Sequence, residues 1–257
     1  MTYKPSMYWE NINYEMYQRL WKGGYDNFKA TSAILYNDDY NGNMDKQQFD
    51  IKTVWESLYE YIPKELLESV EEPLVGNPYH VICDGRVITL DLACSIREYW
   101  LLSQHVDFKN IKRIVEIGGG YGRTAYVIKK LHPEIQYDMY DVEPSIGLAK
   151  RYLNDVIPSN NMKFETPDKL DGKCDLFLAI NCLHEMKVEH VGEYFDYADK
   201  NAGYFYFSCW YRGTVPFDNL VWLKKDYPVR EHWKQLVSQP HIRQGWFEEL
   251  YKCQISA

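Results

Sequence analysis

Residues 113–131 read RIVEIGGGYGRTAYVIKKL, and this stretch decides the fold. An apolar run carries the acid Glu116 near its end, four of the five positions 118–122 are glycine, and a segment with helical spacing follows. A strand, a glycine-rich turn and a helix in this order are typical of an open α/β sheet, in which ligands bind beyond the carboxyl ends of the strands. Glycine lets the main chain approach a ligand and adopt a positive φ at low cost. We therefore expect a small-molecule site at this turn.

The alternation of strand and helix continues after the turn, which predicts a doubly wound, mostly parallel sheet with helices on both faces. Residues 174–180 are largely apolar, as expected of a central parallel strand. The tail, residues 241–254, is expected to supply a closing pair of strands. The expected strands are residues 113–117, 135–140, 162–165, 174–180 and 204–210, and the expected helices are residues 122–131, 144–156 and 188–200.

The part of the chain before this alternation reads as mainly helical. Residues 51–62 have apolar side chains with a 3.6-residue period. The Asp84-Gly85 pair lies between two apolar runs and predicts a hairpin, and Asp91 is expected to cap the helix that follows. We expect residues 1–106 to form a helical cap with a small hairpin, and residues 107–257 to form the ligand-binding domain.

The composition favours a small-molecule substrate. The 257 residues carry a formal net charge of −8 without a Lys/Arg cluster, which argues against a nucleic-acid partner. Six cysteines without a CxxC pair indicate reduced thiols in a cytoplasmic protein. We expect neither a signal peptide nor a membrane span. Aromatic residues make up 16% of the chain, which suits a pocket for planar or sugar-like ligands and is compatible with a homodimer.

The glycine spacing separates two cofactors that such a turn can hold. A dinucleotide site needs G-x-G-x-x-G with a small last residue. Counting from Gly118, that last position holds Arg123, whose guanidinium does not fit a close contact between helix and strand. The chain instead places Glu116, Gly118, Gly120 and Gly122 at alternate positions. This pattern resembles that of class I S-adenosylmethionine-dependent methyltransferases.

The resemblance implies a Rossmann-like domain with a seven-stranded, mostly parallel sheet. It further implies that Glu116 lies near the amino-acid end of S-adenosylmethionine. The turn would wrap the methionine part of the cofactor with Gly118, Gly120, Tyr121 and Gly122.

A second acid agrees with this assignment. Asp141 follows the expected second strand, nineteen residues after Gly122. An acid at this place binds the ribose in nucleotide-binding sheets, and a carboxylate suits two neighbouring hydroxyl donors because it only accepts hydrogen bonds. The alternative is a solvated acid in a turn. We expect Asp141 and the adjacent Val142 to bind the cofactor.

The turn after the fourth strand, AINCLHEM at residues 179–186, is where the resemblance places the reactive methyl group. Amino-group methylases of nucleic acids read N/D-P-P-Y/F there, and this turn has no proline. A hydroxyl nucleophile must lose its proton, for which a histidine is a suitable general base. We expect His184 to be that base; a hydrogen-bonded turn histidine is the alternative. Glu185 is expected to orient His184 or to face the adenine or the substrate, and Asn181 to touch the cofactor or to shape the turn.

The chain also resembles the sugar O-methyltransferases encoded among bacterial surface-polysaccharide (capsule or lipopolysaccharide) genes. The resemblance covers about residues 76–186 and implies a nucleotide-linked or glycan sugar hydroxyl as acceptor. It also implies that the segment before the first strand folds over the cofactor. In that family an arginine and an aromatic residue tend to be adjacent, whereas Glu98 separates them here. The matching features are GNP at residues 76–78, Arg97-Glu98-Tyr99, EIGGGYG at residues 116–122 and Glu185-Met186.

Three further residues are candidates for ligand contacts. The guanidinium of Arg97 could pair bidentately with the methionine carboxylate; a solvated helix arginine is the alternative. His80 and Asp84 could enter the acceptor pocket, or serve only as a polar strand residue and a hairpin-turn residue. HxH, HxxxH and DxD pairs are absent, and Cys182 and His184 lack further ligands in the sequence, so we expect a metal-independent enzyme.

Three other functions compete with sugar methylation. One is methylation of another small polar acceptor, such as a phosphoryl or amino group of a capsule precursor. A module that only binds the cofactor is disfavoured because the set of acid and glycine positions is intact. A nucleotide-sugar oxidoreductase is disfavoured by Arg123 and by the lack of a Tyr-x-x-x-Lys pair after the fourth strand.

Overall fold

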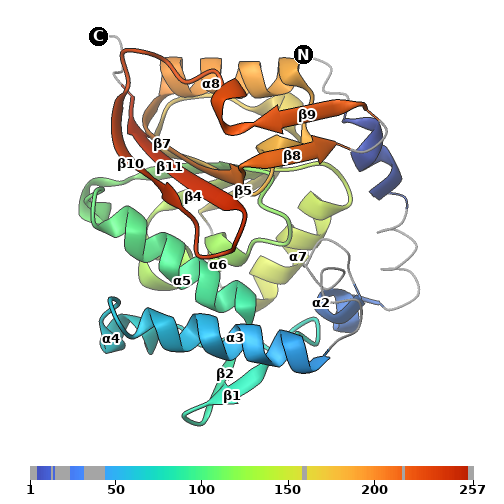
Figure 1. Cartoon of the computed structure of the whole chain (residues 1–257), viewed down its shortest axis with the longest axis vertical. Coiled ribbons are helices and arrows are strands. Elements are labelled where there is room, and N and C mark those ends of the chain that lie inside the picture. The colour runs from blue at the N-terminus through green and yellow to red at the C-terminus, as the bar shows by residue number, and fades with distance from the viewer. Residues whose placement is uncertain are drawn as a thin grey trace.

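The fold is built on a seven-stranded sheet, seen in a computed structural model that describes residues 5–12, 14, 24–31, 44–157, 161–215 and 218–253 (Figure 1). Its strand order is β10-β11-β7-β6-β3-β4-β5. Neighbouring strands are parallel from β7 to β5, and β11 runs antiparallel to both β7 and β10. The strands are β3 (Arg113–Ile117), β4 (Gln136–Tyr140), β5 (Met162–Glu165), β6 (Cys174–Ile180), β7 (Ala202–Trp210), β10 (Lys234–Pro240) and β11 (Trp246–Lys252).

Helices cover both faces of this sheet because alternate side chains of each strand point to opposite faces. One face packs against α5 (Leu90–Ser103), α6 (Arg123–Leu131) and α7 (Ser145–Val156). The other face packs against α8 (Val188–Asn201) and a small hairpin of residues 212–223. The predicted mostly parallel, Rossmann-like α/β sheet with helices on both faces is confirmed.

The N-terminal region packs below α5 in Figure 1. The predicted hairpin is present, and Asp84 and Gly85 take the positive φ values of 50° and 76° that its two-residue turn needs. Asp91 does not cap α5, because the hydroxyl of Thr89 accepts from the amide of Leu92 at 3.0 Å. The elements here are η1 (Tyr25–Asn27), α2 (Phe28–Thr31), α3 (Met44–Leu58), α4 (Lys64–Leu67), β1 (Val81–Cys83), β2 (Arg86–Ile88) and η4 (Phe108–Asn110).

The C-terminal part differs from the prediction in two places. The closing strands are β10 and β11, so residues 241–245 form the turn between them rather than a strand. An additional antiparallel hairpin, β8 (Arg212–Val215) and β9 (Leu220–Leu223), was not predicted. The indole of Trp222 fastens it by donating a hydrogen bond to the carbonyl of Met186 at 3.0 Å. The remaining short helices are η5 (Pro167–Lys169), η6 (Leu183–Glu185) and η7 (Lys224–Asp226).

Two neighbouring residues of α5 tie the N-terminal region to the sheet. Arg97 forms a bidentate ion pair with Glu248 of β11. Glu98 accepts from both terminal nitrogens of Arg123, at 2.9 Å each, at the start of α6. Both carboxylates are fully buried. Helix α5 therefore packs as part of the sheet domain, although it precedes the first strand.

None of the helices in the described ranges has both the length and the apolar character needed to cross a membrane.

Candidate active site

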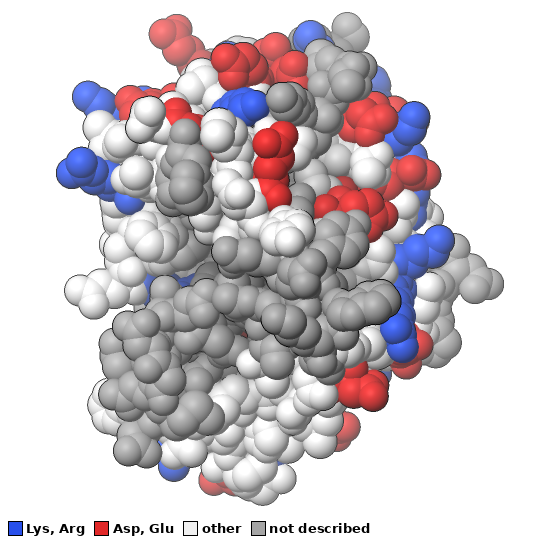
Figure 2. Space-filling view, turned by 90° about the vertical axis from the view of Figure 1, so that its right-hand side faces the viewer, with Lys and Arg blue, Asp and Glu red and all other residues white. Residues whose placement is uncertain are grey.

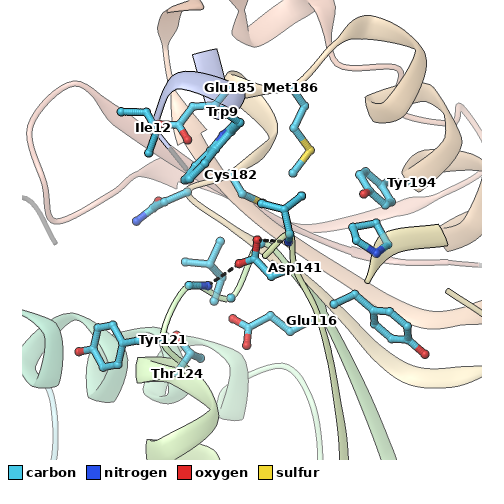
Figure 3. A pocket seen from close by; sticks show the side chains of 18 of the residues that line it. Trp9, Ile12, Glu116, Tyr121, Thr124, Asp141, Cys182, Glu185, Met186 and Tyr194 are labelled. Atoms are coloured by element: carbon cyan, nitrogen blue, oxygen red, sulfur yellow. Dashed lines mark hydrogen bonds between the residues drawn. The ribbon is translucent and has the colours of Figure 1, made fainter. Parts of the chain in front are cut away.

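A cavity of about 350 Å³ lies at the carboxyl ends of β3, β4 and β6 (Figure 3). This is the edge at which an open α/β sheet binds its ligands. Of the predicted cofactor-binding residues, all but Gly122 and Arg97 line it. Those that do are Glu116, Gly118, Gly120, Tyr121, Asp141, Val142 and Asn181.

The glycine turn forms one wall of the cavity with bare main chain. Gly118 has φ +64°, and a Cβ at this position would lie 2.4 Å from the Cβ of Cys182. Gly122 does not line the cavity but precedes α6 with φ +95°, where a Cβ would lie 2.5 Å from a methyl group of Leu153. Side chains at these positions would be strained and would also clash. The glycines are thus required by two separate contacts of the turn.

Glu116 is buried below the glycine turn and faces the cavity. One of its carboxylate oxygens accepts a hydrogen bond from the hydroxyl of Tyr137 at 2.9 Å. Burial raises the pKa of Glu116 to about 7, because this hydrogen bond offsets only part of the lost hydration.

Asp141 joins the end of β4 to the glycine turn. Its carboxylate accepts from the amide of Gly120 at 2.8 Å and from the amide of Val142 at 2.7 Å, as the dashed lines in Figure 3 show. Burial raises the pKa of Asp141 to about 7; these two bonds act in the opposite direction, and the charge of Glu185 adds a smaller increase. Glu185 is therefore within electrostatic reach of Asp141 across the cavity.

The charges of the cavity suit a cationic, hydroxyl-bearing ligand. Glu116, Asp141 and Glu185 line it, while the lining residue Arg123 is held by Glu98. A cradle of glycine main chain and two buried carboxylates fit a nucleoside with a positively charged sulfur. On the face shown in Figure 2, Asp and Glu side chains are prominent in the upper half, and Lys and Arg lie mostly toward the edges.

The turn after β6 carries the predicted catalytic residues. Asn181 has a positive φ of 58°, and its side-chain oxygen accepts from the hydroxyl of Ser208 at 2.7 Å. Glu185 lines the cavity. His184 lies just behind the lining, 5% exposed, with its Nε2 3.5 Å from Oε1 of Glu185. His184 therefore does not line the cavity itself but lies behind Glu185, which does.

Aromatic rings surround the imidazole of His184. It stacks on Trp210 with 5.9 Å between ring centroids and meets Trp246 edge-on at 5.2 Å, and both tryptophans line the cavity. Burial lowers the pKa of His184, but the neighbouring Cys209 thiol and Glu185 carboxylate outweigh this effect and raise the pKa to about 9. Its Nδ1 is buried and finds no hydrogen-bond partner in the described part of the chain.

Three predicted ligand contacts are corrected by the structure. Arg97 is paired with Glu248 on β11, so its guanidinium is not available to a ligand carboxylate. His80 is exposed with its ring at the carbonyl of Pro78, and Asp84 is exposed in the turn between β1 and β2. None of the three lines the cavity, because Arg97 is buried against β11 and the other two lie in or beside the exposed hairpin β1–β2.

Sequence reasoning missed several lining residues that come from distant parts of the chain. Tyr8, Trp9 and Ile12 belong to the N-terminal segment, and Trp210 and Trp246 to β7 and β11. The only signal for them in the sequence is the density of aromatic residues in those segments. Within the described ranges, no group of three or more His, Cys, Asp or Glu side chains is arranged to hold a metal ion.

Comparisons with known proteins agree with the fold. The structure of the PH0226 protein from Pyrococcus horikoshii OT3 shares the fold, with a TM-score of 0.50 and 13% identity over 61% of this chain and 87% of that one. A second similar structure is an S-adenosylmethionine-dependent methyltransferase from Clostridium acetobutylicum, with a TM-score of 0.47 and 12% identity over 63% of this chain and 91% of that one. A third is the mitomycin 7-O-methyltransferase MmcR, with a TM-score of 0.48 and 11% identity over 96% of this chain and 69% of that one. No curated protein sequence matches the chain.

Residues 92–198 match the family described as the O-methyltransferase domain. The matched range runs from α5 to α8 and contains the glycine turn, Asp141 and His184. The predictions of a methyltransferase enzyme and of S-adenosylmethionine as its cofactor agree with this match: residues 92–198 are similar to an O-methyltransferase domain.

Proposed function

We propose that this methyltransferase methylates a hydroxyl group of a sugar, either nucleotide-linked or part of a surface-polysaccharide precursor. The observation that carries the proposal is the union of three carboxylates and several aromatic side chains around one cavity at the methyl-transfer edge of the sheet. Aromatic rings offer apolar faces to the C–H side of a sugar, and carboxylates accept hydrogen bonds from its hydroxyls.

The cofactor half of the cavity is assigned to the glycine turn and the two acids beside it. S-adenosylmethionine supplies a methyl group activated by a positively charged sulfur. The Asp141 carboxylate would accept from the ribose hydroxyls, since it already stands at the end of β4 with hydrogen bonds that fix its orientation. Glu116, at the other end of the turn, would accept a hydrogen bond from the amino group of the cofactor's methionine part. The main chain at Gly118 leaves the space that a side chain would fill.

Proton removal from the acceptor is assigned to His184, with Glu185 between it and the cavity. The imidazole accepts a proton only in its neutral form, and a pKa of about 9 keeps most of it protonated at neutral pH. Transfer should therefore become faster as the pH rises toward 9. Glu185, which lines the cavity, would take the proton from the acceptor hydroxyl and pass it to Nε2 of His184, 3.5 Å away, and its carboxylate would then stabilise the imidazolium.

An uncharged hydroxyl is favoured over a phosphoryl acceptor. Glu116, Asp141 and Glu185 line the cavity, and like charges this close repel an anionic group. The pyrophosphate of a nucleotide sugar would accordingly lie outside the cavity, with only the sugar inside.

The predicted cytoplasmic location, the homodimer, the absence of a metal requirement and the division of the chain at residue 106 stay predictions.

Calorimetry with S-adenosylhomocysteine tests the cofactor half, and methyl transfer from labelled S-adenosylmethionine to UDP-glucose, GDP-mannose and dTDP-glucose tests the acceptor. We expect Asp141→Asn to weaken S-adenosylhomocysteine binding by about ten-fold or more, since a charged hydrogen bond contributes roughly 1.5–3 kcal/mol. Unchanged binding in this variant would place the cofactor elsewhere. Transfer to catechol or to an amine, but to none of the sugars, would overturn the sugar assignment.

A further inference from the structure

The N-terminal segment contributes a wall of the cavity that no sequence motif announced. Residues 7–12 are helical, and the side chains of Tyr8, Trp9 and Ile12 line the cavity. Figure 3 shows the indole of Trp9 and the side chain of Ile12 above Cys182 and beside Glu185. The Cys182 side chain itself stands against Gly118. Trp9 thus covers the part of the cavity next to the glycine turn.

Three hydrogen bonds hold this helix in place. The hydroxyl of Ser6 donates to the carbonyl of Glu185 at 3.0 Å. The amides of Met7 and Tyr8 donate to the two carboxylate oxygens of Asp218, at 3.2 and 3.1 Å. Asp218 lies in the connection between β8 and β9, and Figure 1 shows the helix, in dark blue, beside this hairpin.

The two amides that donate hydrogen bonds to Asp218 belong to the first turn of the helix, where amides lack an acceptor within the helix. A carboxylate there also interacts favourably with the positive end of the helix dipole. The described residues 7–12 make fewer than two helical turns, and so short a stretch is not stable alone in water. The position of residues 7–12 therefore depends on these contacts and on the packing of their apolar side chains. Asp218 therefore helps to hold Trp9 over the cavity.

We propose that Trp9 is a ligand-binding residue that covers the bound cofactor, and that Asp218 is the positioning residue that holds it there. The inference rests on the proposed function, because it takes the cavity as the S-adenosylmethionine site. The face of an indole ring attracts positively charged ligand groups, and its area shields a bound nucleoside from water. Loss of either residue should weaken retention of the cofactor without unfolding the domain.

The test measures the affinity of the full-length protein for S-adenosylhomocysteine by calorimetry and its release rate by stopped-flow competition. We expect Trp9→Ala to weaken binding by about ten-fold and to speed release, as truncation of a buried aromatic anchor does, and Trp9→Phe to restore most of the affinity. Asp218→Ala should weaken binding by about three- to five-fold, the worth of a modest hydrogen bond, and Asp218→Asn should recover part of it. Met7→Ala is the control, because its side chain is 51% exposed and its amide remains.

Thermal unfolding by circular dichroism accompanies each variant, and we expect midpoints close to that of the wild type. Equal affinity of Trp9→Ala and wild type would overturn the proposal. So would an equal loss in Trp9→Ala and Met7→Ala, or a loss in Asp218→Ala that Asp218→Asn does not reduce at all. A wild-type protein that does not bind S-adenosylhomocysteine would instead refute the proposed function, since the cavity would then not be the cofactor site.

Discussion

The two halves of the cavity are built in different ways. The cofactor half comes from one continuous stretch, residues 113–142, in which β3, the glycine turn, α6 and β4 follow one another. The other half is assembled from η6 and from single tryptophans on β7 and β11, and residues 8–12 cover the cavity on the side of the cofactor. The first half can therefore be identified from local sequence, whereas the second exists only once distant segments have packed together.

The halves also differ in chemistry. Buried carboxylates and bare main chain dominate the first, and aromatic rings around His184 dominate the second. If each half serves its own ligand, a variant in one half should change one step and spare the other. The following predictions, from the largest expected effect to the smallest, test this division.

Replacing His184 should have the largest effect. We expect His184→Ala to slow methyl transfer by roughly 10²- to 10⁴-fold, the usual contribution of a general base, with S-adenosylhomocysteine affinity within about two-fold of the wild type. In the wild type the rate should rise with pH and level off near the His184 pKa of about 9. Single-turnover transfer measured from pH 6 to 10 checks both expectations.

The control for this variant is His190→Ala, which removes a histidine of α8 that pairs with Glu193. An equal loss of transfer and of S-adenosylhomocysteine affinity in His184→Ala would show that His184 only supports the turn. A flat pH profile between 7 and 9 would remove it as the base.

Gly118→Ala should disable the cofactor half. Its φ of +64° and the 2.4 Å approach of a Cβ to Cys182 force the glycine turn to move. We expect S-adenosylhomocysteine affinity to fall by about a hundred-fold, because a shift of the main chain disrupts several contacts at once. Gly192→Ala on α8 has open space around its Cβ and should leave the affinity unchanged. Tight binding by Gly118→Ala, measured by calorimetry, would contradict the assignment of this turn.

Glu116→Gln should stabilise the cofactor-free protein. Burial raises the pKa of Glu116 from 4.5 to about 7, so the folded state binds this proton more tightly than the unfolded chain. Stability from this group is present below its unfolded pKa and is lost as the pH rises through 7. We expect Glu116→Gln to raise the free energy of unfolding by about 1–3 kcal/mol at pH 8.

This gain should shrink toward zero as the pH falls to 4.5, where the unfolded-state carboxyl also takes up its proton. Urea unfolding at several pH values measures it, and Glu68→Gln on the exposed surface serves as control. The same Glu116→Gln variant should bind S-adenosylhomocysteine more weakly. A variant that is less stable than the wild type at pH 8 would mean that Glu116 has a counter-charge in solution.

Gly213→Ala should have the smallest effect. A Cβ on Gly213 of β8 would lie 2.9 Å from the Cβ of His184, closer than real Cβ atoms come, so His184 or β8 must shift. We expect transfer to slow by about three-fold, since catalysis depends on the placement of the base, while S-adenosylhomocysteine affinity stays the same. An unchanged rate would show that the hairpin β8–β9 does not position His184.

The contrast between the halves also explains what the sequence could predict. Glu116, the glycines and Asp141 are found by spacing because two adjacent parallel strands bring them together, whatever the rest of the chain does. The prediction that Arg97 binds a ligand is wrong because its real partner, Glu248, lies 151 residues away and cannot be identified from the local sequence. Trp9 belongs to no recognisable motif, because its position over the cavity depends on Asp218, which lies 210 residues after Tyr8.

Secondary structure follows the same rule. The strands β3 and β6 were predicted because both of their faces are buried and their residues are mostly apolar. The edge strand β10 is mostly polar, and of its seven residues only Leu236 and Val237 pack in the core. Thr89 rather than Asp91 caps α5, because the two candidates lie two residues apart and only packing selects between them. Asp91 instead accepts from the hydroxyl of Tyr121 at 2.7 Å.

The neighbouring charges of α5 have a consequence for protein engineering. Arg97 points to Glu248 on the last strand, and Glu98 points to Arg123 at the first βα turn. A fragment that starts at residue 107 would leave Arg123 and Glu248 without their counter-ions, at a cost of about 3–5 kcal/mol for each broken buried pair. Chimeras and truncations that are to fold must therefore keep the chain from Leu90 onward, even though the sheet begins much later.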